Sequence, residues 1–210
     1  MILKSYQVIK EIEDGERSKS KDPLVITPLL RKERQRLSGA ASMDLRLGCW
    51  FLVGRPGKIG IHDIYTKGKS MPSETKLSKS FFVPFGDHFI IQPHAFILGI
   101  TLEWIRLPCN RAAYVIGKSS WGRHGLIIAT ATGVHPGFTG CLTLELANIG
   151  DIPVTIKPGT RICQLFIHSV ESSFKGFDKS SFMGMRKPQM GSIKVDEIAK
   201  KLALSLDSKK

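Results

Sequence analysis

The stretch from Gly117 to Leu165 decides the fold, and it reads GKSSWGRHGLIIATATGVHPGFTGCLTLELANIGDIPVTIKPGTRICQL. Short apolar runs such as LII, LTLEL and VTI alternate in it with glycine, proline and asparagine, which favour turns. The same pattern begins at Phe81 and continues to His168, and no helix-length apolar pattern interrupts it. We therefore predict a mainly β protein built as an antiparallel sandwich or barrel, and we exclude a parallel α/β fold.

The two ends of the chain carry a different pattern. Apolar residues at roughly helical spacing in residues 1–14 predict a short N-terminal helix. A second stripe predicts a short C-terminal amphipathic helix and consists of Val195, Ile198, Leu202 and Leu206. Residues 15–40 and 64–80 are polar and basic, which indicates two surface insertions. We predict one β-barrel domain over residues 1–172 and a flexible closing tail with the terminal helix over residues 173–210.

The composition and net charge limit the kinds of partner that the protein is expected to bind. The 210 residues are 42% hydrophobic, enough for one sizeable core, and the formal net charge is +13. A positive excess suits a polyanion such as nucleotide phosphates. This excess is spread along the chain, which is more typical of plain solubility, and nucleic acid is not an expected partner. No apolar run approaches the ~20 residues of a membrane span, and the first residues lack a signal-peptide pattern.

The cysteines and histidines form no metal-binding pattern. The four cysteines stand far apart, without the CxxC pairs of a zinc ribbon. Cys141 and Cys163 lie in apolar strand patterns and are expected to be small buried side chains, so we infer a reducing compartment and a cytoplasmic location. No His-x-Glu with a following Pro-Cys-x-x-Cys occurs, which excludes the zinc-dependent base deaminases. We expect no metal ligands on the protein.

The segment Gly117–Gly125 combines hydroxyl groups with cations. Its polar members are Lys118, Ser119, Ser120 and Arg123. The glycines that bracket them permit close backbone approach, and guanidinium and hydroxyl donors suit phosphate oxygens. The Walker phosphate loop is excluded because Ala112 stands where that motif requires glycine. No Gly-x-Ser-x-Gly elbow marks a serine nucleophile, and an ordinary polar hairpin remains the alternative.

A single carboxylate stands in the predicted strand Cys141–Ala147. The leucines of this strand alternate with Thr143, Glu145 and Ala147, so Glu145 is expected to point away from the leucine face. A carboxylate between small neighbours is costly to bury without a partner, and a cleft or a subunit interface would supply one. A solvated glutamate on an edge strand is the alternative.

Taken together, these motifs resemble the dCTP deaminase branch of the trimeric dUTPase superfamily. The resemblance covers about residues 1–10 and 42–168. Its motifs are Ser42-Met43-Asp44-Leu45-Arg46-Leu47-Gly48, Lys118-Ser119-Ser120-Trp121-Gly122-Arg123-His124-Gly125, Pro136-Gly137-Phe138-Thr139-Gly140, Leu144-Glu145 with Asn148, and Pro158-Gly159 with Ile162-Cys163-Gln164-Leu165-Phe166. The resemblance implies a distorted antiparallel β-barrel or jelly-roll, and it implies a homotrimer with active sites shared between subunits. It also implies Mg²⁺ held mainly by the substrate triphosphate, with no zinc.

The resemblance further implies roles for single residues. Glu145 would be the general base that takes a proton from the water attacking C4 of cytosine, with Ser119 and the Ala131 carbonyl orienting that water. Arg123 would stabilise developing charge near the base and pair with phosphate. The other residues of the expected substrate site are Lys118 and Ser120 on the phosphates, the Thr143 and Leu144 backbone on the pyrimidine edge, and Trp121, Gly122, His135 and Gln189.

His135 departs from the family pattern, in which an aspartate usually precedes Pro-Gly. In dUTPases the carboxylate of this turn activates the water that cleaves the α,β-phosphoanhydride, whereas in the deaminases it contacts the deoxyribose. Histidine can hydrogen-bond a 3′-hydroxyl or act as a base near neutral pH. The substitution therefore argues against dUTPase or bifunctional activity. The tail is also a loose match, with Gln189 as its candidate phosphate ligand.

The expected activity is the hydrolytic deamination of dCTP to dUTP and ammonia. Two alternatives stay open. A dUTP diphosphatase, alone or combined with the deaminase, would release pyrophosphate from dUTP. A non-catalytic deoxynucleotide-binding homologue on the same scaffold would bind deoxynucleotides without turnover.

Overall fold

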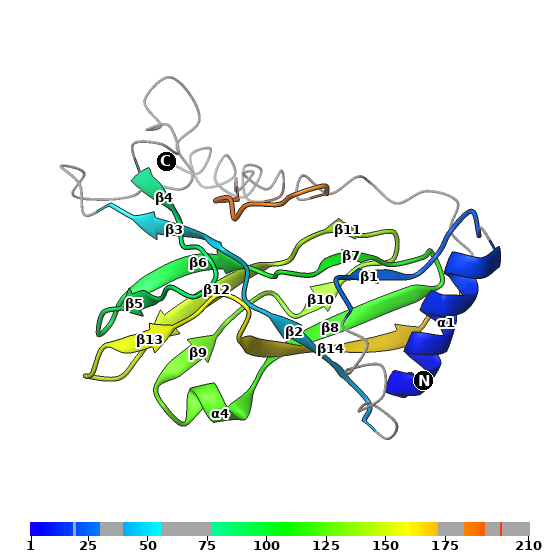
Figure 1. The fold of residues 1–210 in the computed structure, drawn as a ribbon, viewed down its shortest axis with the longest axis horizontal. Helices are drawn as coiled ribbons and strands as arrows, with labels where there is room; N and C mark the ends of the chain where they lie inside the picture. The colour runs from blue at the N-terminus through cyan, green and yellow to red at the C-terminus, as the bar shows by residue number, and fades with distance from the viewer. Residues whose placement is uncertain (19, 30–39, 56–76, 172–182, 192–197, 199–210) are drawn as a thin grey trace, which may run out of the picture.

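The computed structural model describes residues 1–18, 20–29, 40–55, 77–171, 183–191 and 198 (Figure 1). The prediction of a mainly β protein is confirmed, and all paired strands in the described part of the chain run antiparallel. The strands form separate, strongly curved sheets rather than one closed barrel. Short strands with frequent turns produce this architecture, and many of the strands end at or beside a glycine or proline.

Two sheets contain most of the strands. The five-stranded sheet consists, in spatial order, of β4 (Ser78–Phe82), β3 (Trp50–Gly54), β6 (Phe96–Ile100), β12 (Thr143–Asn148) and β9 (Leu126–Ile128). The four-stranded sheet consists of β10 (Gly133–Val134), β8 (Arg111–Gly117), β14 (Arg161–Ser169) and β2 (Met43–Arg46). The smaller sheets are β1 (Val25–Thr27) with β7 (Trp104–Arg106) and β11 (Thr139–Gly140), and β13 (Val154–Ile156) with β5 (Phe89–Ile91).

The two large sheets share one hydrophobic core. Leu144 and Leu146 of β12, Val115 of β8 and Leu165 of β14 all belong to it and are at most 2% exposed. Because side chains alternate across a strand, the residues between these positions point outward. Full burial of a leucine stabilises the fold by roughly 1.5–3 kcal/mol. The shared core therefore fixes the strands, and with them the residues that point outward.

Helix α1 (Ser5–Ser18) packs beside the four-stranded sheet and confirms the predicted N-terminal helix, which extends beyond residue 14 (Figure 1). It buries Val8, Ile9 and Ile12. The hydroxyl of Ser5 donates to the carbonyl of Ala40 at 2.7 Å and to that of Ser42 at 2.9 Å, which ties the start of the helix to the chain entering β2. None of the described helices is long and apolar enough to cross a membrane.

The predicted surface insertions need correction at their ends. Residues 15–40 include strand β1, in which Ile26 is 3% exposed, and Leu24 just before it is 2% exposed. The residues 78–80 of the second insertion belong to β4, where Ser78 is 4% exposed. Residues 30–39 and 56–76 lie outside the described part of the chain. The predicted C-terminal helix lies outside it as well, except for Ile198.

Residues 183–191 of the tail pack against the body of the protein. The amide of Cys141 donates to the Met185 carbonyl at 2.9 Å, and the amide of Gly184 donates to the Thr139 carbonyl at 2.7 Å. Gly140 makes this approach possible, because its φ is +146° and a Cβ there would lie 3.2 Å from the Met185 nitrogen. The Pro-Gly-Phe-Thr-Gly motif therefore provides the surface on which the tail rests.

Candidate functional site

Glu145 lies in the middle of β12 on the outward face of the five-stranded sheet. Burial alternates along the strand, with Leu144 and Leu146 buried and Thr143, Glu145 and Ala147 half-buried, as the sequence predicted. The Glu145 amide donates to the Thr130 hydroxyl at 3.1 Å. Its carbonyl accepts from the Ala129 amide at 2.9 Å. Both the amide and the carbonyl of Glu145 are thus bonded to the residues that directly follow β9, which fixes its backbone.

The carboxylate of Glu145 stands on an apolar surface. Cross-strand partners point to the same face, so Leu98 opposite Glu145 and Phe96 opposite Ala147 are its neighbours on β6. Ile127 lies opposite Ala147 on β9. Phe96 is 56% exposed and Ile127 is 39% exposed. Within the described residues the carboxylate has no hydrogen-bond or ion-pair partner, so its acceptor oxygens are available to a ligand.

The motif Lys118–Gly125 forms one turn of helix, and the alternative of a simple hairpin is wrong. Helix α4 (Ser119–Gly122) is closed by the Arg123 amide, which donates to the Ser119 carbonyl at 3.1 Å. The turn leaves Ser119, Ser120, Gly122 and Arg123 exposed. Their hydroxyl and guanidinium groups therefore point away from the core, where a phosphate can reach them.

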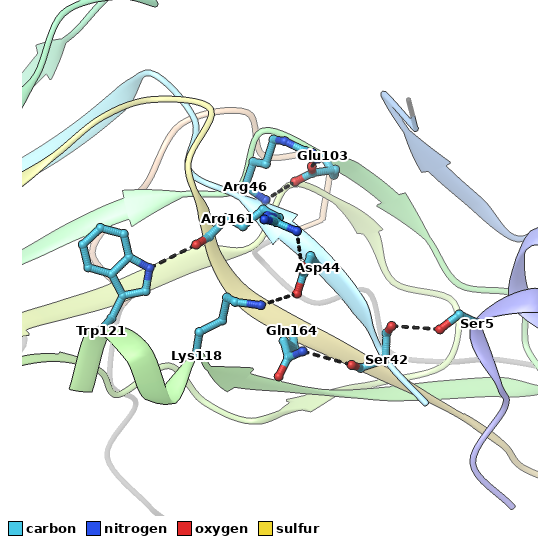
Figure 2. A network of polar contacts seen from close by, with 9 residues as sticks. All are labelled: Ser5, Ser42, Asp44, Arg46, Glu103, Lys118, Trp121, Arg161 and Gln164. Carbon is cyan, nitrogen blue, oxygen red and sulfur yellow. Dashed lines mark hydrogen bonds and ion pairs between the residues drawn. The ribbon is translucent and has the colours of Figure 1, made fainter. Parts of the chain in front are cut away.

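Trp121 does not extend into solvent with its neighbours. Its indole N–H donates to the Arg161 carbonyl at 3.0 Å, and the ring packs against the edge of the core (Figure 2). The indole thus ties α4 to the first residue of β14. In this position Trp121 orients the helix that carries the two serines.

Asp44 of β2 bridges two cations (Figure 2). Its Oδ1 accepts from the Lys118 Nζ at 2.7 Å, and its Oδ2 accepts from the Arg161 Nη1 at 3.3 Å. The Asp44 side chain is only 19% exposed. Gln164, which lies opposite Asp44, donates to the Ser42 hydroxyl at 3.2 Å and extends the same polar row toward α1. The expected phosphate ligand Lys118 is therefore held by a carboxylate that sequence analysis did not single out.

A buried ion pair lies next to this row. The Glu103 carboxylate accepts from the Arg46 amide at 2.8 Å and from the Arg46 Nη1 at 3.3 Å (Figure 2). Burial raises the pKa of Glu103, and its contacts with Arg46 oppose that effect. The Thr101 hydroxyl donates to the Glu103 carbonyl and accepts from the Leu142 amide, each at 2.9 Å. Thr101 thereby links the Glu103–Arg46 ion pair to Leu142, just before β12. No sequence pattern predicted this ion pair.

The remaining predicted site residues lie on the surface. Ala131 is exposed in the link between β9 and β10, and His135 is exposed directly after β10. The His135 carbonyl accepts from the Phe138 amide at 3.2 Å, which closes the turn of the Pro-Gly motif. Gln189 is exposed in the tail. All three residues are therefore open to solvent.

A single chain brings only part of the predicted site together. Lys118 is linked to α4, Asp44 and Arg161 on the side of the four-stranded sheet, whereas Glu145 projects from the outward face of the five-stranded sheet. No hydrogen bond or ion pair joins the Glu145 carboxylate to Ser119 or Arg123 in the described part of the chain. The acid and the cations are therefore not joined directly within the described part of one chain.

A cavity of about 480 Å³ opens beside the tail but contains none of the predicted site residues. Its walls include Trp50, Trp104 and Cys141, and Arg186 of the tail lies with its guanidinium carbon 4.9 Å from the Trp104 ring centre. The Lys187 ammonium lies 3.9 Å from the Trp50 ring centre. These cation–π contacts fix the tail against the sheets.

The cysteines differ in burial. All four are free thiols; Cys163 is buried as predicted, whereas Cys141, which was also expected to be buried, is half-buried like Cys49 and Cys109. Burial raises the pKa of Cys141 to about 11 and that of Cys163 to about 12. Both thiols are therefore protonated at neutral pH and are poor nucleophiles. The described residues contain no group of three or more histidine, cysteine, aspartate and glutamate side chains that is arranged to hold a metal ion.

The sequence is similar to a known protein family and to several named proteins. The model of the dCTP deaminase-like family matches residues 2–170. A protein of Methanobrevibacter smithii named "dCTP deaminase, dUMP-forming" is 36% identical over 208 residues, which cover 96% of this chain and all of that protein. A protein of Natronomonas pharaonis named "dCTP deaminase" is 34% identical over 205 residues, covering 93% of this chain and 96% of the relative.

A solved structure shows the same fold. The crystal structure of 2′-deoxycytidine 5′-triphosphate deaminase from Agrobacterium tumefaciens superposes with a TM-score of 0.55 at 19% sequence identity. The match covers 80% of this chain and 48% of that chain. At this identity the likeness concerns the fold alone, and it agrees with the curved antiparallel sheets described above.

Proposed function

Because the chain belongs to the dCTP deaminase-like family, we propose that it hydrolyses the 4-amino group of dCTP and releases ammonia. One observation carries the proposal: Glu145 is a carboxylate without a partner among the described residues, held in mid-strand on an apolar face. A carboxylate in such surroundings is available to accept a proton from a bound water. The decisive experiment follows ammonia release from dCTP by the wild type and by Glu145→Gln.

The proposed reaction needs one base and one set of donors. Glu145 accepts a proton from water, the resulting hydroxide attacks C4 of cytosine, and the C4–N bond breaks as Glu145 returns protons to the departing amino group. Water and dCTP thus become dUTP and ammonia. The Ser119 hydroxyl and the Ala131 carbonyl orient the water in this proposal, while Arg123 stabilises the charge that develops on the ring. The Thr143 and Leu144 backbone would contact the pyrimidine edge.

The phosphate end of the substrate is assigned to the cationic surface around α4. Hydroxyl, ammonium and guanidinium donors suit phosphate oxygens and not a divalent cation. We therefore propose that Mg²⁺ arrives as a complex with the triphosphate and is bound mainly through it. Ser120 and Lys118 are the expected phosphate ligands on α4, and Gln189 of the tail is a further one. The protonated thiols fit a reducing cytoplasm, which we propose as the location.

The names of the relatives revise the expected product. Proteins of Methanobrevibacter smithii and Persephonella marina that are 36% identical to this chain are both named as dUMP-forming, whereas we predicted dUTP from the sequence and took His135 as an argument against further hydrolysis. We propose that the deaminated nucleotide is also hydrolysed here, so that water cleaves the α,β-anhydride and dUMP leaves with pyrophosphate. An exposed imidazole can serve as the base for that water near neutral pH.

His135→Ala is expected to separate the two products. Loss of the base should lower pyrophosphate release by about 100-fold, because general base catalysis contributes that much or more. Ammonia release should fall far less, and dUTP should accumulate. His135→Asp supplies a carboxylate in the same turn and should retain pyrophosphate release. Both products are measured in parallel by coupled assays, and pyrophosphate release at the wild-type rate in His135→Ala would remove this residue from the chemistry.

We further propose that the chain forms a homotrimer in which Glu145 of one copy meets the α4 surface of another. The proposal is supported by the lack of a hydrogen bond or ion pair between these groups in the described part of one chain. The exposed side chains of Phe96 and Ile127 beside Glu145 also support it, because exposed apolar patches of this kind favour contact with another protein. A neighbouring copy would cover them and exclude water from the carboxylate.

Phe96→Glu is expected to break this assembly. A charge at the centre of an apolar contact is costly to bury, so the variant should elute as a monomer in size-exclusion chromatography with light scattering. Ammonia release should fall by at least about 100-fold, since each site would lack half of its residues. Phe85→Glu is the matched control, because Phe85 is 61% exposed but lies in the turn before β5. A fully active monomeric Phe96→Glu protein would contradict shared sites.

A further inference from the structure

Lys118 and Arg161 form a pair of neighbouring cations at the junction of β8 and β14. Gly117 lies opposite Cys163 in the sheet, and the Lys118 amide donates to the Ile162 carbonyl at 3.2 Å. The two side chains therefore leave adjacent strands at the same edge of the sheet. No sequence motif assigned a role to Arg161.

Both cations bind the same carboxylate and keep most of their donors free. Asp44 uses one oxygen for each, at 2.7 Å to Lys118 and 3.3 Å to Arg161 (Figure 2). An ammonium has three N–H donors and a guanidinium has five, so several donors remain on each group. The Arg161 side chain is 55% exposed and that of Lys118 is 25% exposed, which leaves these donors accessible to a ligand.

The same surface contains further groups that suit an anion. The exposed hydroxyls of Ser119 and Ser120 follow Lys118 directly, and the indole of Trp121 binds the Arg161 carbonyl at 3.0 Å. Two cations face one carboxylate here, so the cluster retains a positive charge. Asp44 reduces the repulsion between Lys118 and Arg161 and holds them side by side, an arrangement that suits the oxygens of a single phosphate chain.

We propose that Arg161 is a further phosphate-binding residue of the substrate site and that Asp44 is the residue that positions it beside Lys118. The inference rests on the proposed function in that the phosphate belongs to a deoxynucleoside triphosphate. It is independent of the chemistry at the base, because the cations of this cluster would bind a polyphosphate without any pyrimidine. Tripolyphosphate is therefore a probe that separates the two proposals.

The experiment measures tripolyphosphate binding to the full-length protein by isothermal titration calorimetry at fixed ionic strength. Arg161→Gln is expected to raise the Kd about tenfold, because a charge-assisted contact to phosphate is lost. It should raise the KM for dCTP by a similar factor and lower kcat less than it raises KM. Arg161→Lys keeps the charge and should recover much of the affinity. Melting temperatures establish that each variant is folded.

Asp44→Asn distinguishes ligand binding from a structural role. It removes the ion pairs but keeps both cations, so the loss of positioning should raise the Kd for tripolyphosphate by less than Arg161→Gln does. Equal weakening by Asp44→Asn and Arg161→Gln would overturn the inference in favour of a purely structural pair. Arg106→Gln is the matched control, because Arg106 also pairs with an aspartate, Asp22 at 3.5 Å, but belongs to β7.

The remaining outcomes separate the inference from the proposed function. Arg161-dependent binding of tripolyphosphate by a protein that releases no ammonia from dCTP would support the phosphate site and refute the deaminase. Normal deamination by Arg161→Gln, with wild-type KM and wild-type tripolyphosphate affinity, would refute the phosphate site and leave the deaminase in place.

Discussion

Glu145→Gln is expected to lower the rate of ammonia release from dCTP by about a thousandfold, within the range that a general base contributes. The amide matches the carboxylate in size, and the backbone bonds to Thr130 and Ala129 do not involve the side chain. The fold and the contacts to the nucleotide should therefore persist. The loss should appear in kcat, with a KM for dCTP close to the wild-type value.

The control for this variant is Glu171→Gln, which makes the same chemical change at an exposed glutamate beyond β14. It should deaminate dCTP at the wild-type rate. Ammonia release by Glu145→Gln at that same rate would show that Glu145 is not the base. Tight binding of dCTP by a wild-type protein without turnover would instead favour the non-catalytic homologue.

Glu103→Ala is expected to have the largest effect on folding. The carboxylate of Glu103 is 2% exposed and accepts from both the amide and the guanidinium of Arg46, which is itself 14% exposed. Removing one partner of a buried ion pair costs about 3–5 kcal/mol. The free energy of unfolding, measured by urea denaturation, should fall by that amount.

A more exposed ion pair provides the comparison. Glu11 accepts from the Arg111 Nε at 3.1 Å, and their side chains are 27% and 18% exposed. Because solvent screens such a pair, Glu11→Ala should lower the free energy of unfolding by no more than about 1 kcal/mol. Similar losses for Glu11→Ala and Glu103→Ala would show that burial does not set the strength of the inner pair.

The pH dependence of stability tests the same carboxyl group. Burial raises the pKa of Glu103 above its ordinary value of 4.5, so the folded state binds the proton more tightly than the unfolded state. The stability that this group contributes is fully present below that ordinary value and is lost as the pH rises through the folded-state pKa. Glu103→Gln keeps an acceptor for the Arg46 amide and should lack this decline. Parallel stability profiles for the two proteins would contradict the raised pKa.

The alternation of side chains made part of this structure predictable from the sequence. In β12 the period of two places Glu145 opposite to Leu144 and Leu146, and local geometry alone decides that. The N-terminal helix followed in the same way from the spacing of Val8, Ile9 and Ile12. Such features depend only on residues within one helix or strand, so the local sequence pattern is enough to predict them.

Features that depend on distant residues were not predictable in this way. Strand β1 has only three residues, and the prolines on either side of it suggested a loop. Its pairing with β7 nevertheless brings Ile26, and Leu24 just before it, into the core. Asp44 meets Lys118 and Arg161 only after three strands align. Neither the burial of Leu24 and Ile26 nor the contacts of Asp44 can be predicted from a local pattern, because both depend on pairing between distant strands.

All three tryptophans of the chain lie at junctions outside the fully buried core. Trp50 and Trp104 are covered by Lys187 and Arg186 of the tail, and Trp121 is bonded to the Arg161 backbone. Indole emission responds to neighbouring charge and to water. The intrinsic fluorescence of this protein should therefore report changes in the surroundings of the tail and of α4 without a label, and Trp121→Phe would separate the contribution of α4 from that of the tail.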